Sequence, residues 1–246
     1  MPFVCAGHPS RDALPEVLAG CERGGASIIE VGVPFSDPIA DGPVIAAAMH
    51  GALREGMTPS LLFEQVRSVR DSLSSALVAM VSVSIVRRLG GSTGFVREAV
   101  AAGFDGFIFP DAPLEEAEPL IEACKSEGAR LSLLVAPTTR PERLAAIASA
   151  STGFVYVLAR AGLTGERSDA PDVAGVVQAV RRATSTPVVC GFGVGTAQQV
   201  RQVAEHADGV IVGSALVRRL SEAVSNGESP GSAAERIVAE LAAGLG

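Results

Sequence analysis

Eight short apolar segments that alternate with longer amphipathic ones constrain the fold of this chain more than any other feature. The predicted strands are residues 3–6, 27–33, 77–83, 106–109, 131–136, 153–158, 188–191 and 209–212. The predicted helices are residues 13–23, 59–72, 94–102, 114–127, 141–150, 173–184, 197–206 and 232–243. Strands that alternate with helices form parallel sheets, and eight of them close most simply into a barrel. We therefore expect a (β/α)8 TIM barrel, with a doubly wound open sheet as the alternative.

The composition supports one folded unit. The chain has 246 residues, of which 48% are hydrophobic and 19% charged, and no linker or low-complexity segment divides it. We expect residues 1–246 to form a single domain. Its apolar stretches are strand-sized and no signal peptide opens it, which predicts a soluble, cytoplasmic protein without membrane contact. A net charge of −7, one tyrosine and no tryptophan argue against nucleic acid as a partner.

Glycine and proline gather where the predicted strands end. The loops read V-P-F-S-D-P, F-P-D-A-P, V-A-P-T-T, G-F-G-V-G and V-G-S-A. Loops at the carboxyl ends of barrel strands carry the active site in this architecture. Their position favours the barrel over the open sheet and predicts a functional site at this end.

The stretch E-V-G-V-P-F-S-D-P-I-A-D-G-P places acids on the second strand and in its loop. Because residues two apart share a face of a strand, Glu30 is expected to point into the barrel, with its pKa raised by burial. Such a carboxyl suits general acid–base catalysis; the alternative is a buried glutamate satisfied by backbone groups. Asp37 precedes Pro38 and suits a turn, whereas Asp41 suits either catalysis or a helix cap.

Two glycine-rich loops follow the last two strands. The first, G-F-G-V-G, lacks the spacing of a dinucleotide fingerprint, and the second is V-G-S-A before a helix. Backbone N–H groups in such loops, together with a helix N-terminus, make an anion site, and barrels commonly hold phosphate there. The alternative is a pair of tight turns and caps. A further loop, A-R-A-G-L-T-G, suits either a lid over the barrel mouth or a mobile surface loop.

Cysteine and histidine are too scattered to form a metal centre. The four cysteines are Cys5, Cys21, Cys124 and Cys190, without C-x-x-C spacing, and the histidines are equally dispersed. We expect no metal site and four reduced thiols in the core.

Taken together, these motifs resemble the tryptophan synthase alpha subunit family. The matching pieces are E-V-G-V-P-F-S-D-P-I-A-D-G-P, F-P-D-A-P-L-E-E, G-F-V-Y-V-L-A-R-A-G-L-T-G, G-F-G-V-G and V-G-S-A-L-V, which span nearly the whole chain in the family order. The resemblance implies a carbon–carbon lyase that cleaves indole-3-glycerol phosphate to indole and glyceraldehyde 3-phosphate, for tryptophan biosynthesis.

The resemblance also implies roles for individual residues. Glu30 would be the acid–base residue and Asp41 the carboxylate facing the indole N–H. The residues expected around the substrate and its phosphate are Phe3, Tyr156, Thr164, Gly165, Phe192, Gly193, Gly213 and Ser214, with Thr164 in the closing lid. Asp37 and Pro38 would face a beta subunit, which receives indole through a tunnel in an alpha2–beta2 complex. That partner carries pyridoxal phosphate, so no cofactor is expected in this chain.

Two departures from the family pattern bear on these expectations. Gly7-His8-Pro9 stands where Gly-Asp-Pro is expected, and the third strand ends in Met80-Val81-Ser82 instead of a Tyr-x-Asn pair. The second affects the ring side of the pocket and the partner interface, but neither acid. Two alternatives follow: a stand-alone lyase with the same chemistry, and a catalytically silent regulatory partner of the beta subunit.

Overall fold

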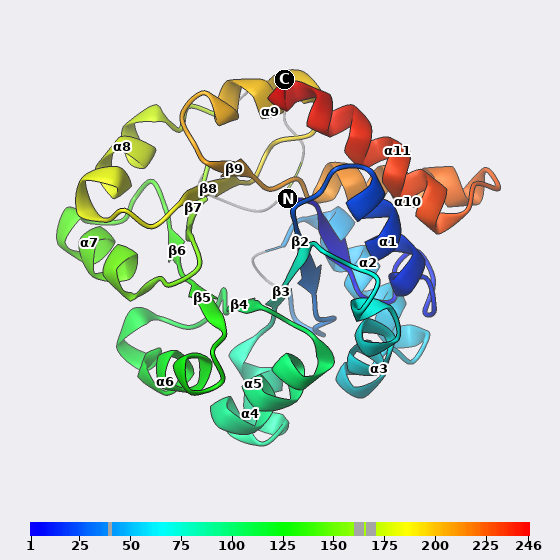
Figure 1. The fold of residues 1–246 in the computed structure, drawn as a ribbon, viewed down its shortest axis with the longest axis horizontal. Coiled ribbons are helices and arrows are strands. Elements are labelled where there is room, and N and C mark those ends of the chain that lie inside the picture. Colours follow the sequence, from blue (N-terminus) through cyan, green and yellow to red (C-terminus); the bar gives the residue numbers. More distant parts are fainter. Residues whose placement is uncertain (39–40, 160–164, 166–170) are drawn as a thin grey trace.

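The computed structural model describes residues 1–38, 41–159, 165 and 171–246. Its strand segments, in chain order, are β1 (Phe3–Cys5), β2 (Ile28–Gly32), β3 (Ala76–Met80), β4 (Gly106–Ile108), β5 (Arg130–Ser132), β6 (Leu134–Val135), β7 (Val155–Leu158), β8 (Val188–Gly191) and β9 (Gly209–Val210). Figure 1 shows them as an inner ring surrounded by helices, as the alternation in the sequence predicts for a TIM barrel.

The helices lie between successive strands and cover the outside of the ring (Figure 1). They are α1 (Leu14–Arg23), α2 (Pro43–Arg54), α3 (Pro59–Arg70), α4 (Val83–Arg88), α5 (Gly91–Ala102), α6 (Glu118–Ser126), α7 (Pro141–Ala150), α8 (Ala174–Ala183), α9 (Ala197–Ala204), α10 (Ser214–Ser225) and α11 (Pro230–Ala242), with short 3₁₀ turns η1 (Leu114–Glu116) and η2 (Ala243–Leu245).

All paired strands are parallel and follow the chain order around the barrel. Hydrogen-bonded pairing runs from β1 to β5 and again from β6 to β9. The segments β5 and β6 are halves of one predicted strand, interrupted at Leu133, whose N–H donates to the Ser151 hydroxyl at 3.3 Å. The ring closes where Phe3 donates its N–H to the Val212 carbonyl at 2.9 Å, beside a parallel bridge from Pro2 to Val212.

Side chains of the strands alternate between two apolar clusters. Ile29, Val31 and Val33 belong to the large core between the strands and the helices. The inward set of neighbouring strands includes Phe3 and Tyr156, which pack in a second cluster together with side chains of α2 and α10. The two-residue period of the strands thus separates an outer core from an inner one.

The helices of the structure differ from the predicted ones in three regions. The helix α2 was not predicted, because Asp-Gly-Pro suggests a turn; Gly42 is in fact its N-cap and Pro43 its first residue, where a missing N–H costs nothing. The short helix α4 was also missed, since the predicted strand ran on to residue 83. The predicted helix 114–127 is divided, because Ala117 ends η1 and caps α6, whose second residue is a proline.

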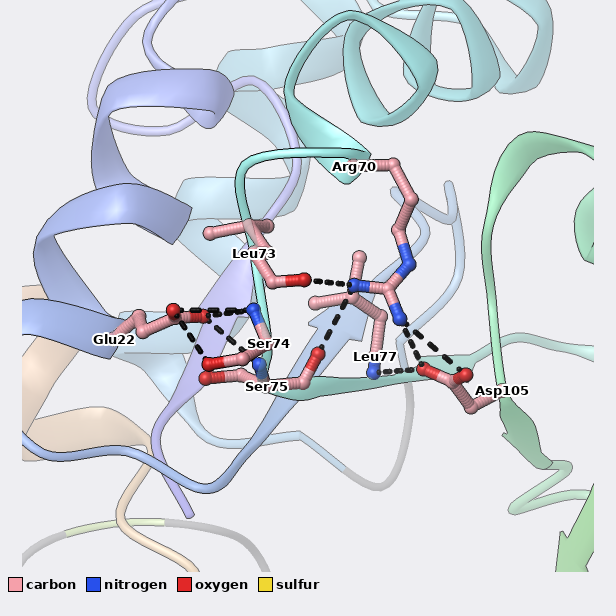
Figure 2. Close-up of polar contacts among 7 residues, drawn as sticks. All are labelled: Glu22, Arg70, Leu73, Ser74, Ser75, Leu77 and Asp105. Atoms are coloured by element: carbon pink, nitrogen blue, oxygen red, sulfur yellow. Dashed lines mark hydrogen bonds and ion pairs between the residues drawn. The ribbon is translucent and has the colours of Figure 1, made fainter.

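A polar clamp ties the amino ends of β3 and β4 to the helices (Figure 2). The Glu22 carboxylate at the end of α1 accepts hydrogen bonds from the Ser74 and Ser75 N–H groups at 3.0 and 2.9 Å. Asp105 accepts from the Leu77 N–H at 2.7 Å and from the Arg70 guanidinium at 3.3 Å. These contacts lie at the end of the barrel opposite the predicted site, where they serve stability.

The thiol prediction is confirmed, since all four cysteines are buried and free. In the described residues, no helix is both long and apolar enough to cross a bilayer. The same residues contain no group of three or more His, Cys, Asp or Glu side chains that could hold a metal ion.

Candidate active site

A cavity of about 180 Å³ opens at the carboxyl ends of the strands. Its walls are largely apolar, with two carboxyl groups and a glycine-rich end among them. The lining residues are Phe3, Glu30, Asp41, Ile45, Met80, Pro110, Leu134, Tyr156, Leu158, Gly165, Phe192, Gly193, Val194, Ile211, Gly213 and Ser214. Residues from most of the barrel strands therefore meet at the end that the loop composition indicated.

Glu30 lies on β2 between Phe3 of β1 and Val78 of β3 and is fully buried. Neither of its carboxyl oxygens has a hydrogen-bond partner among the described residues. The pKa of Glu30 is raised to about 8, chiefly by burial; the Met1 ammonium group lowers it and the charge of Asp41 raises it by smaller amounts. The alternative of a glutamate satisfied by backbone groups does not fit this environment. A carboxyl group that is protonated at neutral pH and faces a cavity can donate a proton to a bound molecule.

Asp41 also lines the cavity and immediately precedes the N-cap of α2. Its N–H donates to the Pro38 carbonyl at 3.0 Å, and the next residue, Gly42, is the N-cap of the helix. The side chain is half-buried, and burial raises the pKa of Asp41 to about 6. Asp41 is not the N-cap of α2, so helix capping, the alternative considered from the sequence, does not explain an aspartate at this position. Asp41 ionises at a lower pH than Glu30, which separates the two carboxyls into an acid and a carboxylate near neutral pH.

Two aromatic walls of the cavity depend on glycines in neighbouring strands. A Cβ on Gly32 would lie 2.6 Å from the Phe3 ring, and one on Gly191 would lie 2.7 Å from the Tyr156 ring. The rings occupy the space that larger residues would fill. Tyr156 also packs edge-on to Phe192, with ring centroids 6.5 Å apart. A flat apolar molecule would find rigid aromatic surfaces on this side.

The two glycine-rich loops converge at one end of the cavity. Gly193 and Val194 come from the loop after β8, and Gly213 and Ser214 from the start of α10. The first N–H groups of a helix have no partner within it, so α10 presents donors and the positive end of its dipole here. Phe192 and Gly193 both have positive φ, of 83° and 80°. Phe192 adopts this costly conformation where it lines the cavity.

The other half of the first glycine loop caps α9. Gly195 and Thr196 donate their N–H groups to the Gln199 side chain at 2.8 and 3.2 Å, and the Thr196 hydroxyl accepts from the Gln199 N–H. This is a capping box. The loop G-F-G-V-G-T is therefore divided: its beginning lines the cavity and its end caps a helix.

The residues predicted for the partner interface, Asp37 and Pro38, do not line the cavity. Asp37 is exposed and Pro38 half-buried, outside the cavity, and the Asp37 carboxylate accepts a hydrogen bond from the Ser36 hydroxyl at 2.6 Å. Thr164 falls outside the described residues. Of the predicted lid, the structure describes Ala159, which is buried, and Gly165, which lines the cavity.

Sequence reasoning missed most of the aliphatic lining of the cavity. Its residues are Ile45, Met80, Pro110, Leu134, Leu158 and Ile211. The two-residue period of the strands could have predicted several of them. Met80 lies two positions after the inward Val78, and Leu158 lies two positions after Tyr156. Leu134 pairs with Tyr156 on the neighbouring strand. Ile45 could not be found this way because α2 was not predicted.

The fold and the site define the class: a TIM-barrel enzyme equipped for acid–base chemistry, with an apolar cavity, two carboxyls of separated pKa and an end rich in backbone donors.

Comparisons with known proteins identify the family. The family model described as tryptophan synthase alpha chain matches residues 1–245. A tryptophan synthase alpha chain from Synechococcus sp. (strain CC9902) is 45% identical over 225 residues, which are 91% of this chain and 83% of the relative. The chain belongs to the tryptophan synthase alpha chain family, whose members act as carbon–carbon lyases.

Solved structures agree with the sequence relatives. A tryptophan synthase structure from Mycobacterium tuberculosis superimposes with a TM-score of 0.89 at 38% identity, covering 99% of this chain and 91% of that one. A tryptophan synthase complex from Pyrococcus furiosus gives a TM-score of 0.87 at 32% identity, covering 98% and 96%. The expected TIM barrel is thereby confirmed at the level of the whole fold.

Proposed function

We propose that Glu30 and Asp41 carry the retro-aldol cleavage of indole-3-glycerol phosphate to indole and glyceraldehyde 3-phosphate in this cavity. The observation that carries the proposal is the fully buried, unpaired carboxyl of Glu30, which faces a cavity with aromatic walls and a donor-rich end. The substrate has the matching parts: a flat apolar ring, a hydroxyl beside the bond to be broken, and a phosphate.

The phosphate and the ring fix the substrate between two ends of the cavity. The backbone N–H groups of Gly193, Gly213 and Ser214 suit the phosphate, since the helix dipole of α10 favours an anion there. Phe3, Tyr156 and Phe192 suit the indole ring. Gly165 borders the same cavity, and Thr164 is proposed as a residue of the closing lid. Holding both ends orients the reacting carbon toward the acids.

Glu30 is proposed to move both protons. In its protonated form it donates a proton to C3 of the indole, which leaves a positive charge delocalised onto the ring nitrogen. The resulting carboxylate then takes the proton of the adjacent glycerol hydroxyl. As that C–O becomes a carbonyl, the C–C bond breaks and its electrons return to the ring. One proton is delivered and one recovered, so the products are indole and glyceraldehyde 3-phosphate.

Asp41 is proposed to stabilise the charged intermediate. Its carboxylate, ionised above a pKa of about 6, accepts the hydrogen bond of the ring N–H as that nitrogen becomes positive. The interaction strengthens in the transition state, which is what makes it catalytic.

A Glu30→Gln variant tests the proposal. The amide keeps the size of the side chain but cannot transfer a proton, so indole release should fall by about 10²- to 10⁴-fold. The matched control is Glu16→Gln on the exposed face of α1, which should keep wild-type turnover. Near-normal turnover of Glu30→Gln in a correctly folded protein would overturn the assignment.

We further propose a beta-subunit partner and a cytoplasmic location. Solved relatives include a tryptophan synthase complex, which supports an assembly of this kind, and the exposed Asp37 with Pro38 offers a contact surface. Pyridoxal phosphate would belong to that partner, which would receive the indole. Adding a purified beta subunit should raise the rate of indole formation. An unchanged rate would favour the stand-alone lyase, and no indole formation under either condition would favour a silent regulator.

A further inference from the structure

We propose that His8 is a positioning residue for the phosphate end of the active site, acting through α10. The inference rests on the proposed function, because it concerns the same phosphate. His8 lies in the loop after β1, within the Gly7-His8-Pro9 stretch that the catalytic assignment leaves unused. Its ring reaches the first turns of the helix whose N-terminus lines the cavity.

The contact is made through one ring nitrogen. His8 Nε2 lies 3.1 Å from the Val217 carbonyl oxygen and 2.9 Å from the Ser221 hydroxyl. A carbonyl oxygen only accepts, so Nε2 carries the hydrogen. The Ser221 hydroxyl oxygen accepts the same hydrogen in a bifurcated hydrogen bond. Val217 and Ser221 are one helical turn apart, and His8 therefore bridges two successive turns of a single face of α10.

A short chain of hydrogen bonds leads from His8 to the cavity. The Val217 carbonyl accepts from His8, and the Val217 N–H donates to the Gly213 carbonyl at 3.0 Å. Gly213 lines the cavity and is the N-cap of α10. Fixing Val217 therefore fixes the turn that carries Gly213 and Ser214. A shift of this turn would move the donor groups relative to the phosphate.

The same two elements meet a second time inside the barrel. A Cβ placed on Gly213 would lie 3.6 Å from the Cβ of Phe3, so β1 and the start of α10 are in close contact there. Val217 is itself buried, in the inner cluster with Phe3. His8 thus holds α10 from outside the cavity against the strand that supplies an aromatic wall.

The protonation state agrees with this role. Burial lowers the pKa of His8, so its ring is neutral at neutral pH. The neutral ring with its hydrogen on Nε2 can donate to the Val217 carbonyl.

The test compares two replacements of His8. His8→Phe keeps a ring but removes the donor, whereas His8→Gln places an amide donor at a similar reach. The matched control is His206→Phe, at an exposed histidine after α9. Each protein is assayed for the Kd of glycerol 3-phosphate by calorimetry, and for the kcat and KM of indole-3-glycerol phosphate.

His8→Phe should raise the Kd and the KM by about fivefold, the effect of losing one hydrogen bond, with kcat within about twofold of wild type. His8→Gln should restore both constants, and His206→Phe should change neither. If His8 served stability alone, His8→Phe would lower the Tm but would not raise KM while leaving kcat unchanged.

The outcomes separate the inference from the proposed function. If the wild-type protein does not bind glycerol 3-phosphate, the phosphate site itself is wrong and the inference fails with it. If the wild type binds and His8→Phe binds equally well, only the role of His8 is overturned. Should His8→Phe not fold, His8→Ala is measured by the same criterion; if neither folds, the contact serves stability, which also overturns the inference.

Discussion

Glu30 shows at the scale of one residue how function opposes stability. Its carboxyl is fully buried, and neither oxygen has a hydrogen-bond partner among the described residues. A buried polar group in this state costs free energy that the surrounding packing must offset. Such a cost is expected at a site where the partner is the substrate.

The cost should be measurable as a pH-dependent gain in stability in Glu30→Gln. With the folded pKa at about 8 and an unfolded value near 4.3, the folded state holds the proton longer, so wild-type stability falls as pH rises through this window. Glutamine does not titrate. The variant should be more stable than wild type by roughly 3–5 kcal/mol at pH 7.5, and the difference should nearly vanish at pH 4.5.

Urea unfolding at the two pH values measures this difference, with Glu16→Gln as the exposed control. An equal difference at both pH values would mean that burial does not perturb the Glu30 carboxyl.

At the scale of the element, glycines in the strands decide where the aromatic walls stand. Gly191 of β8 leaves the space that the Tyr156 ring of β7 fills, and Gly32 of β2 does the same for Phe3. Neither glycine has a positive φ, so they are needed for space and not for backbone conformation. The shape of the cavity is thus set by the smallest residues of the sheet.

Gly191→Ala should displace Tyr156. A Cβ there would lie 2.7 Å from the ring, so we expect a loss of about 1–3 kcal/mol in unfolding free energy and a raised KM. Gly175→Ala is the matched control, since Gly175 is exposed in α8 with open space around it, and alanine should stabilise the helix by about 0.5–1 kcal/mol. Chemical denaturation of both variants measures these changes in unfolding free energy. An unchanged stability in Gly191→Ala would show that Tyr156 is free to move.

The polar clamp around Glu22 lies at the opposite end of the barrel and contributes to stability there. Hydrogen bonds from the Ser75 and Ser74 backbone hold the pKa of Glu22 down at about 2. Glu22→Ala should lose about 1–2 kcal/mol at pH 7. Because the folded pKa is depressed, this stability is present above the unfolded pKa near 4.3 and lost as pH falls toward 2, so the difference from wild type should narrow below about pH 4.5.

Unfolding curves at pH 7 and pH 3.5 test the clamp. Glu122→Ala is the control, since Glu122 pairs with Lys125 at an exposed site and should change stability by less than about 0.5 kcal/mol. A difference between Glu22→Ala and wild type that stays constant down to pH 3.5 would contradict the assignment.

For the whole molecule, the sequence predicted the parts that depend on local periodicity. The alternation of strands and helices was enough to predict the barrel. The two-residue period of the second strand was enough to predict that Glu30 points inward. The features it missed depend on distant contacts. The Glu22 clamp joins residues 52 positions apart, and α2 begins at a Gly-Pro pair that suits a turn equally well. In the first glycine-rich loop, the end that caps α9 is set by hydrogen bonds to the side chain of Gln199, which the loop sequence itself does not contain.

The pH dependence of kcat/KM for indole-3-glycerol phosphate tests the central claim most directly. Since kcat/KM reports the free enzyme, activity should fall as pH rises through about 8, where Glu30 loses the proton that it must donate. Asp41 also predicts a fall below about pH 6, but the substrate phosphate titrates there too, so the alkaline limb is diagnostic. A rate that stays constant or rises from pH 7 to pH 9 would contradict the account.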